Sequence, residues 1–138
     1  MSLLLDTNVV SELRKAAKGA AHPQFARWAA QASVSTAFIS VITIMELEAG
    51  ILARQRCDPG QAAVFRVWLD IVESAFDGRT LDVDRRVVKR AAALHIPDPA
   101  PYADALIGAT ALVHGLTIAT RNVADFARFA VAVEDPWQ

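Results

Sequence analysis

Short apolar runs alternate with segments of helical periodicity along this chain. Runs of strand length occur at residues 3–5, 34–40, 79–83, 116–120 and 130–133. Helical patterns lie between them, at about residues 7–15, 22–32, 43–54, 61–76, 85–90 and 102–114. This alternation is typical of βαβ units around a parallel sheet. We therefore predict an α/β fold with a central, mostly parallel sheet of four to five strands.

Composition adds three expectations. The length of 138 residues and the 54% hydrophobic content predict a single domain, residues 1–138, with a well-filled core and some surface buried against a partner. The net charge of −1 gives no global positive field for nucleic acid. One cysteine, Cys57, excludes an internal disulfide, and no apolar run approaches about 18 residues. We expect a cytoplasmic protein that does not enter a membrane.

Four acidic residues lie at strand-to-helix junctions or at helix starts: Asp6, Glu46, Asp104 and Asp125. Ligand sites of open α/β sheets lie at the carboxyl ends of strands. Carboxylates gathered there repel one another unless a hard cation such as Mg²⁺ or Mn²⁺ neutralises them. The pattern therefore predicts one acidic, metal-binding pocket.

Helix capping is the alternative interpretation of each acid taken alone. The capping positions would be Asp6 as N-cap, Thr43 with Glu46 as a capping box, Asn122 with Asp125 as a similar pair, and Asp104 in a first turn. Asp104 argues most strongly for a site, because its helix consists mainly of small and apolar residues. A half-buried carboxylate there needs a partner, and no lysine or arginine lies within a turn of it.

Four blocks of the sequence carry a family resemblance. They are Leu4-Leu5-Asp6-Thr7-Asn8-Val9-Val10-Ser11-Glu12, Ser40-Val41-Ile42-Thr43-Ile44-Met45-Glu46-Leu47 with Gly50, Asp104-Ala105-Leu106-Ile107-Gly108-Ala109-Thr110-Ala111, and Thr120-Arg121-Asn122-Val123-Ala124-Asp125-Phe126 with Asp135-Pro136-Trp137. Together they resemble the PIN-domain ribonucleases, and most closely the toxin half of VapBC-type toxin–antitoxin pairs. The blocks occur in the family's order and cover essentially the whole chain. The resemblance implies a three-layer α/β/α PIN-like domain.

The resemblance also implies roles. Asp6 and Asp104 would bind Mg²⁺, for which Mn²⁺ could substitute, while Glu46 would support the metal or its water. Some relatives place the fourth acid where this chain has Asn122, and others where it has Asp125. Thr7, Asn8, Thr120 and Asn122 would be the polar residues that orient the carboxylates and their waters. The implied partners are an RNA substrate, a small DNA-binding antitoxin and a second toxin copy, within a larger toxin–antitoxin assembly.

Two other functions remain open at this point. A phosphatase of the haloacid-dehalogenase type also begins with a strand followed by an aspartate. That class requires a second aspartate two residues later, where this chain has Asn8. A non-catalytic PIN-like interaction module is the other alternative, against which the retained acids argue.

Basic and aromatic residues give weaker indications. Arg121 could contact an RNA phosphate or pair with Asp125, and the basic helix containing Arg85, Arg86, Lys89 and Arg90 could guide RNA or be a solvated face. The helix at residues 61–76 is apolar nearly all round, so we expect it to meet another chain. A partner segment would then lie along the helices containing Trp28 and Trp68.

Overall fold

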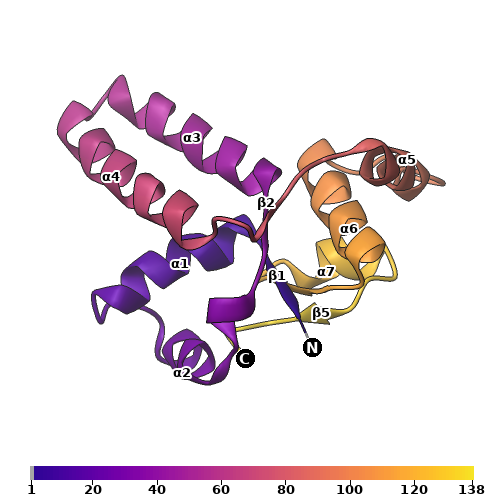
Figure 1. Cartoon of the computed structure of the whole chain (residues 1–138), viewed down its shortest axis with the longest axis horizontal. Coiled ribbons are helices and arrows are strands. Elements are labelled where there is room, and N and C mark those ends of the chain that lie inside the picture. The colour runs from indigo at the N-terminus through magenta and orange to yellow at the C-terminus, as the bar shows by residue number, and fades with distance from the viewer. Residues whose placement is uncertain (1) are drawn as a thin grey trace.

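The computed structural model describes residues 2–138, which form five short parallel strands among seven α-helices (Figure 1). The strands are β1 (Leu3–Leu5), β2 (Ile39–Ser40), β3 (Thr80–Leu81), β4 (Thr117–Ala119) and β5 (Val133–Glu134). β1 pairs with β4, β4 with β5, and β2 with β3. Phe38, next to β2, joins β1 through backbone hydrogen bonds of 2.9 Å from Leu5 N and 2.8 Å to Leu3 O. The order is therefore β3-β2-β1-β4-β5, which confirms the predicted parallel sheet.

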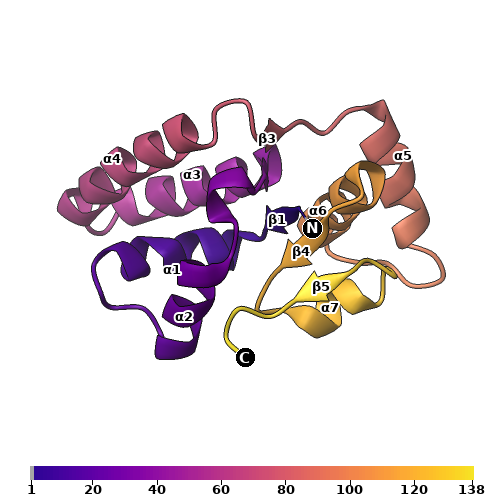
Figure 2. The same cartoon turned by 60° about the horizontal axis from the view of Figure 1, so that its bottom comes forward.

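Helices cover both faces of this sheet. They are α1 (Thr7–Ala17), α2 (Pro23–Gln31), α3 (Val41–Gln55), α4 (Pro59–Ala75), α5 (Arg85–Leu94), α6 (Tyr102–His114) and α7 (Val123–Ala127). Because side chains alternate along a strand, Leu4 packs with α5, α6 and α7, whereas Leu3 and Leu5 pack with α1, α2 and α4. This confirms the three-layer α/β/α fold. The pair α3 and α4 extends away from the sheet at one end of the molecule (Figures 1 and 2).

Small residues let α6 pack closely against its neighbours. A Cβ atom at Gly108 would lie 2.8 Å from Phe129 Cδ2, so no larger residue fits without movement. Gly115 ends the helix at φ 66°, in the left-handed conformation that glycine adopts readily. The bounds of α6 agree with those predicted, and its first turn brings Asp104 to the carboxyl edge of the sheet.

Two strand predictions were wrong by three residues or more at one end. Residues 34–36 form a 3-10 helix, so that only Ile39 and Ser40 remain of the strand predicted at 34–40. The last strand lies at Val133–Glu134, three residues later than predicted, because Phe129 packs back onto Phe126 and lengthens the preceding turn. The order of elements is unchanged by either shift.

Within residues 2–138 no helix combines the length and the apolar character that crossing a bilayer requires.

Candidate active site

Asp6 and Thr120 lie side by side at the carboxyl edge of the sheet. Leu5, the last residue of β1, is in register with Ala119, the last residue of β4. Asp6 and Thr120 directly follow these two residues. Thr120 Oγ1 donates to Asp6 Oδ2 at 2.7 Å, and the Thr7 amide donates to Asp6 Oδ1 at 2.8 Å. Asp6 caps α1, as the capping interpretation expected, but it is also 95% buried beside three other acids. Capping alone does not require that burial.

Glu46 reaches the same edge from the second turn of α3. Thr7 Oγ1 lies 2.6 Å from Glu46 Oε1 and 3.0 Å from Thr43 Oγ1, so one hydroxyl links α1 with α3. The capping-box interpretation of Thr43 and Glu46 was wrong, because Ser40 is the N-cap and its Oγ accepts from the Ile42 amide. Thr43 lies inside the helix, fully buried against Thr7.

Asp104 and Asp125 approach the edge from the other side of the sheet. Asp104 is half-buried in the first turn of α6, and Asp125 is exposed in α7. Asn122 is the N-cap of α7, but its side chain makes no capping hydrogen bond. The predicted Asn122–Asp125 cap therefore exists only as a backbone bond, from the Asp125 amide to Asn122 O at 3.2 Å.

The four acids destabilise one another's charges. Burial, and then the negative charges of Asp6, Asp125 and Glu46, raise the pKa of Asp104 above its ordinary value. Burial also raises the pKa of Asp6, although hydrogen bonds from Thr120 and Thr7 oppose that shift. The ion pairs of residues 2–138 are Lys15–Glu12, Arg66–Glu48 and Arg86–Asp84, so none neutralises the four acids. Their negative charge is therefore not compensated by a cationic side chain of the described residues.

The acids do not form a complete metal centre as they stand. Within residues 2–138 no three His, Cys, Asp or Glu side chains converge closely enough to hold one ion. The charges of Asp6, Asp125 and Glu46 nevertheless act on Asp104, and a divalent cation would relieve that repulsion. Mg²⁺ keeps several waters and needs only one or two protein carboxylates. The donor set therefore fits a hard cation.

Polar residues surround these acids as predicted. Asn8 Nδ2 lies 3.4 Å from Asp6 Oδ2, and Asn8 Oδ1 accepts from the Arg121 amide at 3.3 Å. The Asn122 amide donates to Thr120 Oγ1 at 3.0 Å. The suggested Arg121–Asp125 ion pair does not form among the described residues.

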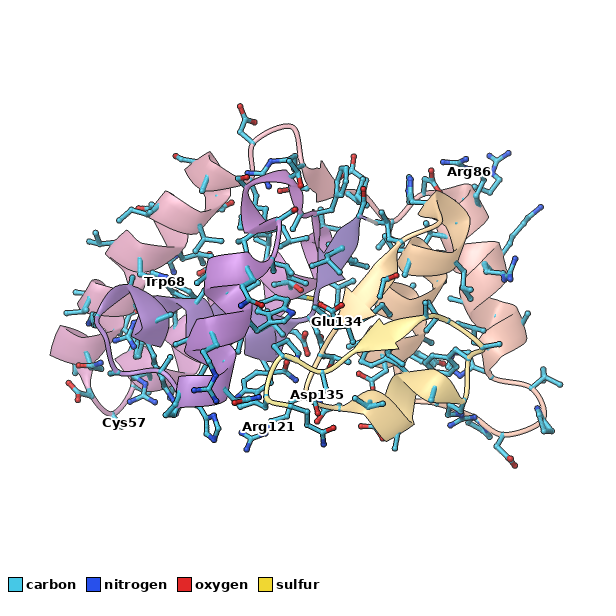
Figure 3. All side chains as sticks on the ribbon, turned by 90° about the horizontal axis from the view of Figure 1, so that it is seen from below. Cys57, Trp68, Arg86, Arg121, Glu134 and Asp135 are labelled. Carbon is cyan, nitrogen blue, oxygen red and sulfur yellow. The ribbon has the colours of Figure 1, made fainter. Side chains whose placement is uncertain are left out.

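The Arg121 guanidinium instead lies over the Trp137 ring, 5.2 Å from its centroid. Figure 3 places it beside Asp135 at the molecular edge. Arg121 and Asp125 line an open pocket of about 410 Å³ there, with residues 122–124, Asp135 and Gln138.

The basic helix lies elsewhere. Arg85, Arg86, Lys89 and Arg90 are exposed on α5, and Figure 3 shows Arg86 at the far end of the molecule from Arg121. The structure therefore does not bring α5 to the acidic pocket.

Trp28 also lies apart from Trp68. It packs on Phe25 at 5.4 Å between ring centroids and donates through Nε1 to Glu134 Oε2 at 2.6 Å.

Several pocket residues were missed from the sequence. Ser11, Arg54 and Phe65 line a second pocket together with Glu46, Thr7 and Trp68. Of the two α4 residues among them, only Trp68 had been named, as a partner contact. A usable signal existed in the helical spacing, because Arg54 lies eight residues after Glu46 and Ser11 lies four after Thr7, each on one helix face. Phe65 and Trp68 come from α4, and no local pattern links them to the acids.

Residues 3–132 match the family model of the PIN domain, and the chain therefore belongs to the PIN-domain family. This confirms the resemblance found in the sequence. The chain is 43% identical to Ribonuclease VapC14 of Mycobacterium tuberculosis over 70 residues, which are 51% of this chain and 65% of that protein. It is 31% identical to VapC ribonuclease Y4jK of Sinorhizobium fredii, covering 99% of this chain and 98% of the relative.

Solved structures agree with the family. FitAcB from Neisseria gonorrhoeae matches with a TM-score of 0.85 and 30% identity over 99% of both chains. FitAB bound to an IR36 DNA fragment matches with a TM-score of 0.84 and 27% identity, over 99% of this chain and 96% of that one. A toxin–antitoxin complex from Klebsiella pneumoniae gives a TM-score of 0.69 and 29% identity, covering 99% and 98%.

Proposed function

We propose that this protein is a divalent-metal-dependent endoribonuclease, the toxin of a toxin–antitoxin pair, which cleaves RNA in the cytoplasm and so inhibits translation and growth. The observation that carries the proposal is the electrostatic coupling of Asp6, Glu46, Asp104 and Asp125 without a protein cation in the described chain. Membership of the PIN family and similarity to VapC ribonucleases support it. The haloacid-dehalogenase alternative has no support in this fold.

Asp6 and Asp104 are the proposed ligands of Mg²⁺ or Mn²⁺, with Glu46 near the ion. A bound divalent cation would lower the pKa of a water and stabilise negative charge on phosphoryl oxygens. Asp6 is held in place, since Thr120 and the Thr7 amide fix one oxygen each. Asp104 carries no hydrogen bond within residues 2–138, so its oxygens are free for a ligand.

Glu46 is the proposed general base or water-positioning group. Thr7 Oγ1 donates to Oε1 at 2.6 Å, which fixes the carboxylate and leaves Oε2 to accept from a water. Asp125 is exposed at the outer edge and would tune the charge of the site. Arg121 is available for a phosphate, since it has no carboxylate partner in the part of the chain that the structure describes.

A small antitoxin is the proposed inhibitor. The solved relatives include a complex described as toxin–antitoxin and another bound to DNA, which supports a DNA-binding antitoxin partner. A homodimer within such an assembly also remains part of the proposal.

The test is cleavage of labelled RNA by the purified protein with Mg²⁺, with Mn²⁺ and with EDTA. We expect cleavage only with metal, and its loss in Asp6→Asn and Asp104→Asn. Glu46→Gln should lower the rate about 10²- to 10⁴-fold, as loss of a general base does. Asp125→Asn should cost about tenfold.

Glu48→Gln is the matched control, because Glu48 lies on the same helix as Glu46 but pairs with Arg66. Undiminished cleavage by Asp104→Asn would refute the mechanism, and metal-independent binding of RNA without cleavage would favour the interaction module. Sequencing the 5′ ends of RNA cut after brief induction would identify the target.

A further inference from the structure

A groove leads from the acidic pocket along three helices. It has a volume of about 280 Å³ and is lined by Thr7, Ser11, Glu46, Leu47, Gly50, Ile51, Arg54, Phe65 and Trp68. Glu46, Gly50 and Arg54 are spaced by four residues, so they share one face of α3. With a rise of 1.5 Å per residue, Arg54 lies about 12 Å along the helix from Glu46. The groove therefore joins the proposed reaction centre to a basic end.

Two arginines contact Phe65, which forms part of the groove wall. Arg54 lines the groove itself, whereas Arg14 lines the neighbouring groove between α1 and α4. The Arg14 guanidinium carbon lies 4.3 Å from the centroid of Phe65, and that of Arg54 lies 5.2 Å from the same centroid. Neither side chain has a carboxylate partner in residues 2–138. Because both guanidiniums lie near one ring, their like charges disfavour each other, and an anion that reached both would be stabilised.

Helix electrostatics account for only part of this arrangement. Arg14 and Arg54 lie in the last turns of α1 and α3, where a cation is favoured by the helix dipole. That effect does not require the two to converge on one ring. Stacking on Phe65 restricts both guanidiniums and therefore lowers the entropy that a bound anion would cost.

We propose that Arg14 and Arg54 bind a backbone phosphate of the RNA strand, not the scissile phosphate but one further along the groove. This rests on the proposed function. Guanidinium groups match phosphate oxygens in geometry and charge. The net charge of −1 leaves the molecule without a general attraction for RNA, so local cations must hold the strand beside the acids. Trp68 offers an apolar wall against which a base can stack.

The experiment measures binding of a 5′-fluorescein 12-nucleotide RNA of random sequence by fluorescence anisotropy. Asp104→Asn is the background, so that the probe is not cleaved. Arg54→Gln, Arg14→Gln and the double variant are compared with Arg56→Gln, which removes the same charge from the end of α3 but does not line the groove. The affinity is measured across a series of salt concentrations.

We expect each groove variant to weaken binding about tenfold, as for a lost charge-assisted hydrogen bond. The slope of log affinity against log salt should fall by about 0.7 for the lost phosphate contact. Arg54→Lys should retain most of the affinity, and Arg56→Gln all of it. Arg54 is the decisive position because it is exposed, so its replacement should not change the melting temperature.

Three results would overturn the inference. Arg54→Gln could match Arg56→Gln in affinity and salt slope, or the background protein could fail to bind the probe at all. Alternatively, the arginine variants could lose affinity for the antitoxin and not for RNA, which would assign the groove to the protein partner. Metal-dependent cleavage by the unmodified protein tests the proposed function separately. None of the three results would contradict that function.

Discussion

The two proposed metal ligands carry the same charge in different surroundings. Both oxygens of Asp6 accept hydrogen bonds from the protein, whereas Asp104 accepts none in the described chain. The metal-free fold therefore compensates the charge of Asp6 and leaves that of Asp104 exposed to three negative neighbours. Hydrogen bonds therefore fix the carboxylate of Asp6 without metal, whereas only a bound cation would compensate the charge of Asp104.

Asp104→Asn should raise the melting temperature in EDTA at neutral pH. The pKa of Asp104 is raised in the folded state, so its ionised form destabilises the fold at neutral pH. The difference in melting temperature between Asp104→Asn and wild type should shrink as pH falls through that raised pKa toward 3.8, because Asp104 of the wild type is then protonated as well. If the substitution relieves about 1 kcal/mol of charge repulsion, the melting temperature should rise by about 2–4 °C.

Asp6→Asn is the matched comparison, and it should gain less because it loses accepted hydrogen bonds. Mg²⁺ should raise the melting temperature of wild type but not of Asp104→Asn. Lower stability of Asp104→Asn in EDTA would identify Asp104 as a structural cap.

The sequence was sufficient to predict the acids but not how their neighbours hold them. The four positions followed from their places after strands and at helix starts. Thr43 was misread, because Ser40 and Thr43 are both competent caps and only tertiary packing decides between them. The bond between Thr7 and Glu46 joins residues 39 positions apart, which no local pattern predicts.

At the scale of elements, α3 connects the chemistry to the groove. Gly50 lies between Glu46 and Arg54 on the groove face, and a Cβ atom there would meet nothing within 4 Å. Glycine costs a helix interior about 1 kcal/mol relative to alanine, so its presence here is not explained by stability. Packing does not explain it either, so the remaining effect of glycine here is that no side chain enters the groove.

Gly50→Gln should therefore stabilise the protein and impair cleavage. Glutamine is a good helix former, and we expect a gain of about 0.5–1 kcal/mol in the free energy of unfolding, measured by urea denaturation. Its side chain would project into the groove, so RNA cleavage should fall at least tenfold with the acids unchanged. Full cleavage by a stabilised Gly50→Gln protein would show that RNA does not use the groove.

Element boundaries could be predicted where local chemistry fixes them. Gly115 and the small residues of α6 defined that helix correctly from Tyr102 to His114. Residues 34–40 were read as one strand because their apolar character gives no sign of the turn at 34–36. The sheet requires only two of those residues, and long-range pairing with β3 decides which.

At the scale of the whole molecule, two apolar surfaces remain uncovered. Val64, Val67 and Ile71 are 49–62% exposed on α4, where they line a groove of about 420 Å³ with α1. Val88 and Tyr102 are 45% and 77% exposed beside α5 and α6. One apolar side of α4 is thus uncovered, and its contact with another chain stays a prediction. Trp68 lines it, but Trp28 does not, because it packs on Phe25 and Glu134 within the protein.

Position favours a different partner for each surface. The α4 groove shares Trp68 with the pocket that begins at Glu46, so a chain bound there can reach the acids. The family resemblance implies that a basic residue of the antitoxin does so. The α5 surface lies at the opposite end of the molecule (Figure 1), which leaves it for a second toxin copy.

Val67→Asp and Val88→Asp should therefore have opposite effects. Each places a charge in an apolar contact that would have to be desolvated on binding, so each should weaken its own interface at least about a hundredfold. Val67→Asp should lose antitoxin affinity by calorimetry yet remain a dimer by light scattering at micromolar concentration, whereas Val88→Asp should become monomeric and still bind the antitoxin. Both should cleave RNA, because neither valine lines the acidic pocket. Loss of the dimer in Val67→Asp with the antitoxin complex intact would reverse the assignment, and a monomeric wild type would reject the homodimer.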